Sequence, residues 1–176
     1  MKIHKRVGAA VLAAWLSACA GGAEGLDALH ADIAADYPGV AHVGADALAA
    51  MPDAVLLDVR EPEEFAVSRL PGAIRVDADE DAQALLSRLP ALEERTVVAY
   101  CSVGRRSSIL TERLSDDLLE AGAGSVVNLR GGVFGWHGEG RPLVDADGPT
   151  DLVHPYDAVW ARYVVRGDKT AYIPEP

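Results

Sequence analysis

The chain has 176 residues, of which 49% are hydrophobic and 24% charged, and its formal net charge is -11. This length and balance predict one globular domain with a sizeable core, and they exclude a disordered or fibrous protein. The acidic excess excludes DNA and RNA as partners, because phosphate backbones are bound through lysine and arginine.

Residues 1–18 are predicted to be a lipoprotein signal peptide. The basic start "MKIHKR" precedes the apolar run "VGAAVLAAWL", which is too short to cross a bilayer core of ~30 Å. The next residues, "LSAC", resemble the lipobox of bacterial lipoproteins, in which Cys19 receives diacylglycerol and becomes the first mature residue. Two other interpretations stay open: an ordinary signal peptide cut within "ACAGGA", and a buried apolar helix.

A lipid on Cys19 would place the protein on the periplasmic side of the cell envelope, in contact with the membrane through its anchor. Ala20 stands where an aspartate marks retention at the inner membrane in enteric bacteria, so attachment to the outer membrane is favoured. Cys101 is then the only free thiol, which excludes an internal disulfide, a Cys-x-x-Cys redox pair and a cysteine zinc site. The histidines outside the signal lack metal-ligand spacing, so we expect neither a metal nor a cofactor.

The mature chain is predicted to begin with a flexible tether at 19–25 and to continue with a domain at 26–145. Apolar spacing, caps and β-branched runs predict helices over 26–37, 44–51, 61–68, 79–89 and 107–122. Strands are expected at 40–43, 54–59, 73–77, 96–100 and 125–129. This alternation indicates an α/β domain with a mainly parallel sheet.

Residues 146–176 form a C-terminal tail of a different kind. Its start is rich in turn residues, yet Tyr156, Trp160, Tyr163 and Val164 would make an apolar patch on a short helix. One interpretation is that this patch docks back onto the domain. The other is that it stays exposed and binds a protein partner.

The stretch "VVAYCSVGRRSS", residues 97–108, carries the main candidate site. A buried strand delivers Cys101 to the carboxyl end of the sheet, where open α/β sheets bind their ligands, and a helix follows at once. The loop's backbone N–H groups can then surround an anion, helped by the helix dipole, and Gly104 permits the required turn. Arg105 and Arg106 add positive charge suited to an oxyanion.

The same positive field favours the thiolate of Cys101, which is the nucleophilic form of cysteine. A lone cysteine at a strand end can instead be a small buried apolar residue. Its place ahead of a glycine-containing, doubly basic turn favours the functional interpretation.

Three segments, at residues 56–77, 97–108 and 126–144, resemble the hallmark segments of a rhodanese domain, in the same order. The resemblance spans 37–144 and implies a single domain with a five-stranded parallel sheet flanked by helices on both faces. It also implies that 101–106, with Ser102 and Val103 between the cysteine and the glycine, is the family's active-site loop. Members of this family carry sulfur as a cysteine persulfide.

The resemblance further implies that Asp58 and Arg60, in "LLDVRE", brace the site. For Arg60 the alternative is an ordinary surface ion pair. Two positions depart from the family's common pattern: Arg69 stands where many members have histidine, and Arg130 where many are acidic. Arg69 would add positive charge near its segment and removes a titratable group.

Loop length separates sulfur-handling members from the related phosphatases. The spacing here is Cys-x-x-x-x-Arg, ending at Arg106, whereas tyrosine and dual-specificity phosphatases need one more residue before the arginine. Position 107 is serine, so the phosphatase spacing fails.

The function expected from these residues is sulfur transfer through a Cys101 persulfide, as in a thiosulfate sulfurtransferase. Its expected partners are a small sulfur-containing anion as donor and a thiol or cyanide as acceptor. Two alternatives remain. The domain could bind an anion or a protein partner without turnover, or Cys101 could cycle through oxidised forms as a single-cysteine periplasmic redox protein.

Overall fold

The computed structural model describes residues 21–174. Five parallel strands form one sheet in the order β1-β5-β4-β2-β3. These strands are β1 (His42–Val43), β2 (Val55–Asp58), β3 (Ile74–Arg75), β4 (Thr96–Tyr100) and β5 (Ser125–Leu129). The central strand β4 pairs with β2 and β5, with Asp58 opposite Tyr100 and Asn128 opposite Ala99. The predicted α/β fold with a five-stranded parallel sheet is confirmed.

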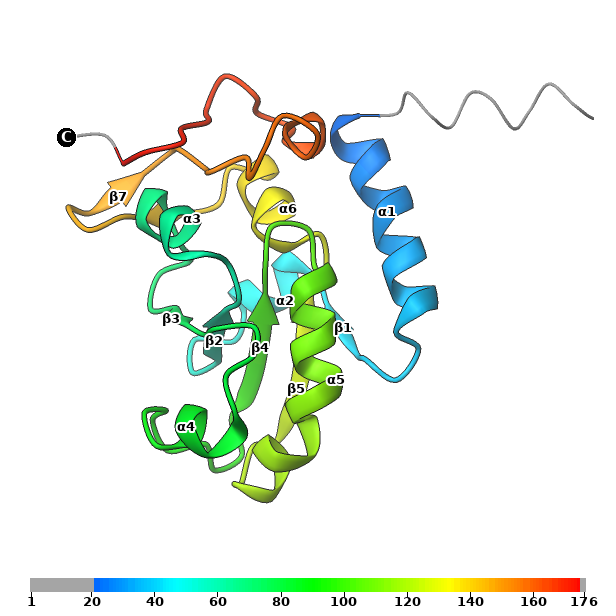
Figure 1. Ribbon diagram of the computed structural model, residues 1–176, viewed down its shortest axis with the longest axis vertical. Coiled ribbons are helices and arrows are strands. Elements are labelled where there is room, and N and C mark those ends of the chain that lie inside the picture. Colours follow the sequence, from blue (N-terminus) through cyan, green and yellow to red (C-terminus); the bar gives the residue numbers. More distant parts are fainter. Residues whose placement is uncertain (1–20, 175–176) are drawn as a thin grey trace, which may run out of the picture.

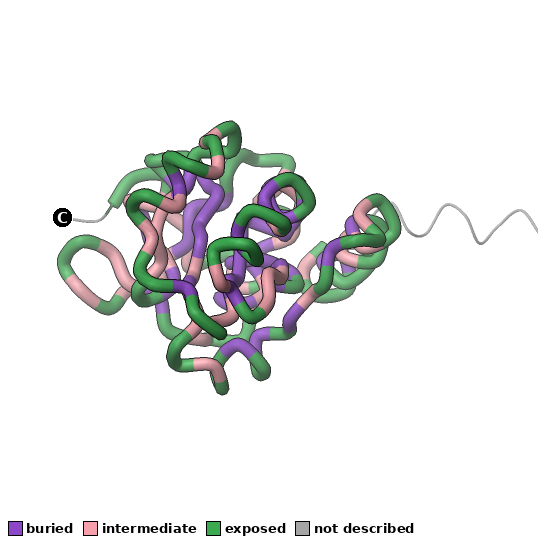
Figure 2. The backbone as a smooth tube through the Cα atoms, turned by 90° about the horizontal axis from the view of Figure 1, so that it is seen from below, coloured by how far each residue is buried: buried purple, intermediate pink, exposed green. Residues whose placement is uncertain are grey.

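Helices cover both faces of this sheet, as Figure 1 shows. They are α1 (Gly22–Asp36), α2 (Ala45–Ala49), α3 (Pro62–Val67), α4 (Ala82–Leu86), α5 (Arg105–Glu120) and α6 (Gly132–Gly138). Because strand side chains alternate between faces, Val97 and Ala99 pack with the apolar stripe of α5, while Val98 and Tyr100 pack with Phe134 of α6. The two core clusters therefore lie on opposite sides of β4, which is buried from Val97 to Tyr100. Figure 2 shows the buried segments, in purple, in the interior of the domain.

Helix α1 begins earlier than the sequence predicts. Residues 22–25, assigned above to a flexible tether, form its first turn, and Gly25 is buried. The reason is tertiary packing: α1 contacts α6 and the short 3-10 helix η2 (Ala161–Tyr163) of the tail. At Gly21 an added Cβ would lie 3.0 Å from the carbonyl oxygen of Arg162, so the chain approaches the tail closely here.

The C-terminal tail packs back onto the domain. A small antiparallel hairpin of β6 (Leu143–Val144) and β7 (Pro149–Thr150) leads into it. Val153 and Val164 are buried in the same cluster as Phe134. In Figure 1 the tail, orange to red, runs from β7 past α6 to the start of α1. The tail therefore lies over the end of the sheet at which β4 delivers Cys101.

The signal peptide assigned to 1–18 and the lipidation site at Cys19 lie outside the described residues. Within 21–174, no helix combines the length and the apolar character that crossing a membrane requires.

Four buried or partly buried histidines predict acid sensitivity of the fold. Burial is the largest cause that lowers the pKa of His30, His42, His137 and His154 below its ordinary value. The unfolded chain therefore binds more protons, so stability is full above the unfolded pKa of about 6.5 and falls as the pH drops below it. Urea unfolding at pH 7.5, 6.0 and 5.0 should give midpoints that decrease in that order. A constant midpoint over this range would contradict this prediction.

Candidate active site

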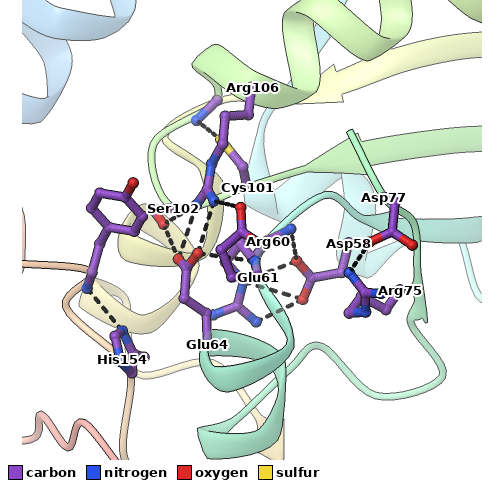
Figure 3. A network of polar contacts seen from close by, with 12 residues as sticks. Asp58, Arg60, Glu61, Glu64, Arg75, Asp77, Cys101, Ser102, Arg106 and His154 are labelled. Atoms are coloured by element: carbon purple, nitrogen blue, oxygen red, sulfur yellow. Dashed lines mark hydrogen bonds and ion pairs between the residues drawn. The ribbon is translucent and has the colours of Figure 1, made fainter. Parts of the chain in front are cut away.

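Cys101 lies at the start of the loop between β4 and α5. Its side chain is buried with 1% exposure, and its Sγ accepts a hydrogen bond from the Gly104 N–H at 3.2 Å. Gly104 has a φ of +105°, a conformation that glycine adopts without strain. The loop therefore turns back on itself, so that its own backbone donates to the sulfur atom (Figure 3).

The same loop forms the N-terminal end of α5. Helix α5 starts at Arg105, two residues earlier than predicted, and the N–H groups of its first turn have no partner within the helix. These groups and the positive end of the helix dipole favour an anion at this position. The Asn128 side chain donates to the Gly104 carbonyl at 2.9 Å and to Ser108 Oγ at 2.8 Å, which fixes the turn.

Helix α6 packs against the loop and donates backbone hydrogen bonds to it. The N–H groups of Val133 and Phe134 donate to the carbonyl oxygens of Cys101 and Ser102 at 2.9 and 3.0 Å. Gly132 has a φ of +56°, and a Cβ there would lie only 2.3 Å from the Cys101 carbonyl oxygen. The "GG" pair at 131–132 thus lets α6 approach the loop closely.

Arg106 points toward the loop and is held by a buried carboxylate. Its two terminal nitrogens donate to the Glu64 carboxylate at 2.8 and 2.9 Å, and Ser102 Oγ also donates to Glu64 at 2.7 Å. Burial raises the pKa of Glu64, but the hydrogen bonds and charge of Arg106 outweigh it, so the net shift is downward. Burial likewise lowers the pKa of Arg106, but Glu64 and the neighbouring charge of Cys101 raise it overall. This network orients Arg106 beside the sulfur.

Arg105 and Arg130 form ion pairs with α1. Arg105 lies 3.0 Å from Asp36, and Arg130 lies 2.9 Å from Asp27. The charge of Arg105, expected from the sequence to serve anion binding, is therefore shared with a carboxylate 69 positions away in sequence. An anion at the loop would therefore depend more on the backbone N–H groups than the sequence indicates.

Asp58 and Arg60 form a fully buried ion pair beneath the end of β4. Arg60 Nη2 lies 2.6 Å from Asp58 Oδ2, with both side chains at 0% exposure, and it also donates to the Ser68 carbonyl at 2.6 Å. The surface ion pair considered for Arg60 is therefore wrong. Burial lowers the pKa of Arg60, but the charge and hydrogen bonds of Asp58 raise it overall.

None of the hydrogen bonds of the Arg69 side chain involves Cys101, Glu64 or Arg106. Its guanidinium donates to the carbonyl of Asp145 at 2.9 Å, and its backbone pairs with Val144. Arg69 thus fastens α3 to the hairpin that leads into the tail.

A pocket of about 150 Å³ opens at Cys101. The loop forms one side through 101–103 and the two arginines, and Tyr156 and Trp160 of the tail form the other. Sequence reasoning did not assign Glu64, Tyr156 or Trp160 to the site. The acidic first turn of α3 indicates only that Glu64 interacts with the N-terminal end of its own helix. The spacing of the tail aromatics does not indicate which surface they cover.

A rhodanese-like domain family model matches residues 44–139. The chain belongs to the rhodanese-like domain family. It is 35% identical over 101 residues to a protein named sulfurtransferase from Allochromatium vinosum, covering 57% of this chain and 88% of that protein. A thiosulfate sulfurtransferase structure from Pseudomonas aeruginosa matches with a TM-score of 0.52 and 28% identity, over 68% of this chain and 23% of that one. A rhodanese-related structure from Thermoplasma volcanium has a TM-score of 0.48 and 26% identity, over 59% of this chain and 97% of that one.

Only one of the two sides of the pocket belongs to the region that the family model matches. The loop that carries Cys101 lies within 44–139 of the rhodanese-like domain, whereas Tyr156 and Trp160 lie beyond its end. Within 21–174, no group of three or more acidic, histidine or cysteine side chains is arranged to hold a metal ion.

Removing the charge of Glu64 should loosen Arg106 in this rhodanese-like domain. Glu64→Gln leaves the half-buried guanidinium with only the more exposed Glu61 carboxylate, 3.6 Å away, and we expect a loss of about 1–3 kcal/mol in unfolding free energy. Because the folded-state pKa of Glu64 is lowered, its contribution is present above the unfolded pKa of about 4.5 and is lost as the pH falls below it. Urea unfolding checks this, with the neighbouring Glu63→Gln as control. Equal midpoints for the two variants at pH 7 would contradict it.

Proposed function

We propose that this protein is a sulfurtransferase that carries sulfane sulfur as a persulfide on Cys101. The observation that carries the proposal is the placement of Cys101 Sγ, which accepts the Gly104 N–H at the N-terminal end of α5. A sulfur atom at that position meets backbone donors and the Arg106 guanidinium, so negative charge on it is stabilised. The names of the sulfurtransferase relatives support the same reaction class.

The first half-reaction takes sulfur from the donor. With thiosulfate, the Cys101 thiolate attacks the outer sulfur, a new S–S bond forms, and the original S–S bond breaks. Sulfite leaves with the electron pair of the broken bond, so no external oxidant or reductant is needed. The N–H groups of 102–106 and the Arg106 side chain stabilise the donor oxyanion and then the persulfide charge.

The second half-reaction returns the thiolate. Cys101 is the only cysteine within 21–174, so no second thiol in these residues can collect the sulfur. An external thiolate or cyanide attacks the outer sulfur of the persulfide, and the Cys101 thiolate leaves with its electron pair. The product is a persulfide of the acceptor or thiocyanate.

The distance from Cys101 to Arg106 in sequence favours sulfur over phosphate as the transferred group. The loop closes over four intervening residues, and Ser107 occupies the position where the phosphatase spacing needs arginine. A ring shorter by one residue suits a single sulfur atom better than a tetrahedral phosphate.

Thiocyanate formation from thiosulfate and cyanide tests the proposal. We expect turnover in this assay, with neither hydrolysis of p-nitrophenyl phosphate nor consumption of hydrogen peroxide. Thiosulfate binding without thiocyanate would support the non-catalytic binding module, and peroxide consumption without sulfur transfer would support the redox protein. Either result would overturn the proposed function.

We also propose that the protein works on the periplasmic side of the cell envelope, anchored through a lipid on Cys19. The pattern of residues 1–19 supports this location. Mass analysis of the protein extracted from membranes tests it, because a lipidated mature chain begins at a modified Cys19.

A further inference from the structure

The pocket at Cys101 has two chemically different sides. The loop side supplies the sulfur atom, backbone N–H groups and guanidinium charge, whereas the opposite side consists of the rings of Tyr156 and Trp160. Its volume of about 150 Å³ equals that of an apolar cavity known to hold one benzene ring. The pocket is therefore large enough for one planar apolar ring.

Local hydrogen bonds hold the aromatic side of the pocket in place. The Asp157 carboxylate accepts the N–H groups of Val159 and Trp160 at 2.8 and 2.9 Å, which starts the short helical turn that presents the indole. The Tyr156 N–H donates to Nδ1 of the buried His154 at 3.0 Å, with Tyr156 at a φ of +69°. A non-glycine residue keeps this conformation only where its surroundings enforce it.

Tyr156 also touches the catalytic loop directly. The centre of its ring lies 5.0 Å from the guanidinium carbon of Arg106, in cation–π contact. Figure 3 shows His154, which fixes the Tyr156 backbone, below the Glu64–Arg106 network. The aromatic residues are thus part of the same site as Cys101, although they come from a segment outside the family match.

An inorganic donor can use only the loop side of this pocket. Thiosulfate is charged and strongly hydrated over its whole surface, so its oxygen atoms would face rings that offer few hydrogen-bond donors. A donor with an anionic sulfur at one end and a planar apolar group at the other matches both sides. Such a group could stack on the rings while its sulfur faces Cys101.

Building on the proposed function, we infer that the preferred sulfur donors are organic sulfane-sulfur anions with a planar apolar substituent, such as aryl thiosulfonates. Tyr156 and Trp160 are the specificity-determining residues. In the reaction, the Cys101 thiolate attacks the terminal sulfur of the thiosulfonate, and the bond between that sulfur and the sulfonyl sulfur breaks. The aryl sulfinate leaves with the electron pair, and the persulfide remains on Cys101.

The test compares benzenethiosulfonate with methanethiosulfonate, using cyanide as acceptor and thiocyanate as the readout. The kcat/KM ratio of the two donors is divided by their rate ratio with a small thiol in solution, which removes the difference between the leaving groups. We expect a corrected preference of at least about tenfold for benzenethiosulfonate, equivalent to ~1.4 kcal/mol of ring contact.

Three tail variants assign this preference to residues. Trp160→Ala and Tyr156→Ala should each bring the corrected ratio toward one, and Trp160→Phe should restore part of it. Val159→Ala is the matched control, because Val159 is 60% exposed and does not line the pocket. It should keep the wild-type ratio. Circular dichroism and thermal unfolding check that each variant is folded.

The outcomes separate the two proposals. Thiocyanate from thiosulfate and both organic donors, with a corrected ratio near one in the wild type, would overturn the donor preference and leave the proposed function standing. A preference that survives in both alanine variants would overturn the assignment to Tyr156 and Trp160. If none of the three donors gives thiocyanate, the proposed function fails, and the donor preference fails with it.

Discussion

The Cys101→Ser variant should lose sulfur transfer while keeping its fold. Serine preserves the size of the side chain and an acceptor for the Gly104 N–H, but a hydroxyl group is un-ionised at neutral pH and does not form a persulfide. Removing an essential nucleophile costs at least about 1,000-fold in turnover in comparable cases. Thiocyanate formation and thermal unfolding of the two proteins measure both parts of the expectation.

Ser102→Ala is a useful comparison for this variant. Ser102 neighbours the cysteine and donates to Glu64 at 2.7 Å, yet it supplies no sulfur atom. Its variant should keep measurable turnover, with the loss limited to the two missing hydrogen bonds of its hydroxyl, to Glu64 and from Arg106, of about 1 kcal/mol each. Full activity in the Cys101→Ser protein would show that the sulfur is carried elsewhere.

The Asp58→Asn variant should be strongly destabilised. It leaves the Arg60 guanidinium, which has 0% side-chain exposure, without an anionic partner. Breaking a buried ion pair by removing one partner costs about 3–5 kcal/mol. Because the Val59 N–H donates to the Tyr100 carbonyl directly before Cys101, the disturbance reaches the base of the loop that carries Cys101. Urea unfolding at pH 7 gives the size of the loss.

A nearby exposed pair provides the matched control. Arg75 and Asp77 lie 2.7 Å apart on the surface, and Asp77→Asn should leave the unfolding midpoint nearly unchanged. Replacing both buried partners together, as in Asp58→Leu with Arg60→Met, should recover much of the stability, since no charge is then left unpaired. Equal midpoints for Asp58→Asn and Asp77→Asn would contradict the role given to the buried pair.

The elements that follow from local pattern were predictable. Strand β4 is a run of residues suited to a strand, beginning with three that are β-branched, and its burial from Val97 to Tyr100 agrees with that pattern. Gly104 adopts the left-handed conformation that the turn was expected to need. These features depend on residues close together in sequence, where periodicity and glycine placement carry the information.

The contacts that complete the site were not predictable in this way. Glu64 meets Arg106 across 42 positions, and Arg105 meets Asp36 across 69. The start of α1 at Gly22 likewise depends on packing against the tail rather than on its own glycine-rich sequence. The helical spacing of Tyr156, Trp160 and Tyr163 predicts an apolar patch but not the surface that it covers, so the placement of Trp160 opposite Cys101 emerges only from the tertiary structure.

Intact mass spectrometry of the purified protein before and after thiosulfate tests the central claim most directly. A Cys101 persulfide predicts a gain of about 32 Da, absent from Cys101→Ser and reversed by cyanide. An unchanged mass with the Cys101 thiol shown to be free, or the same gain in the serine variant, would contradict sulfur transfer through Cys101.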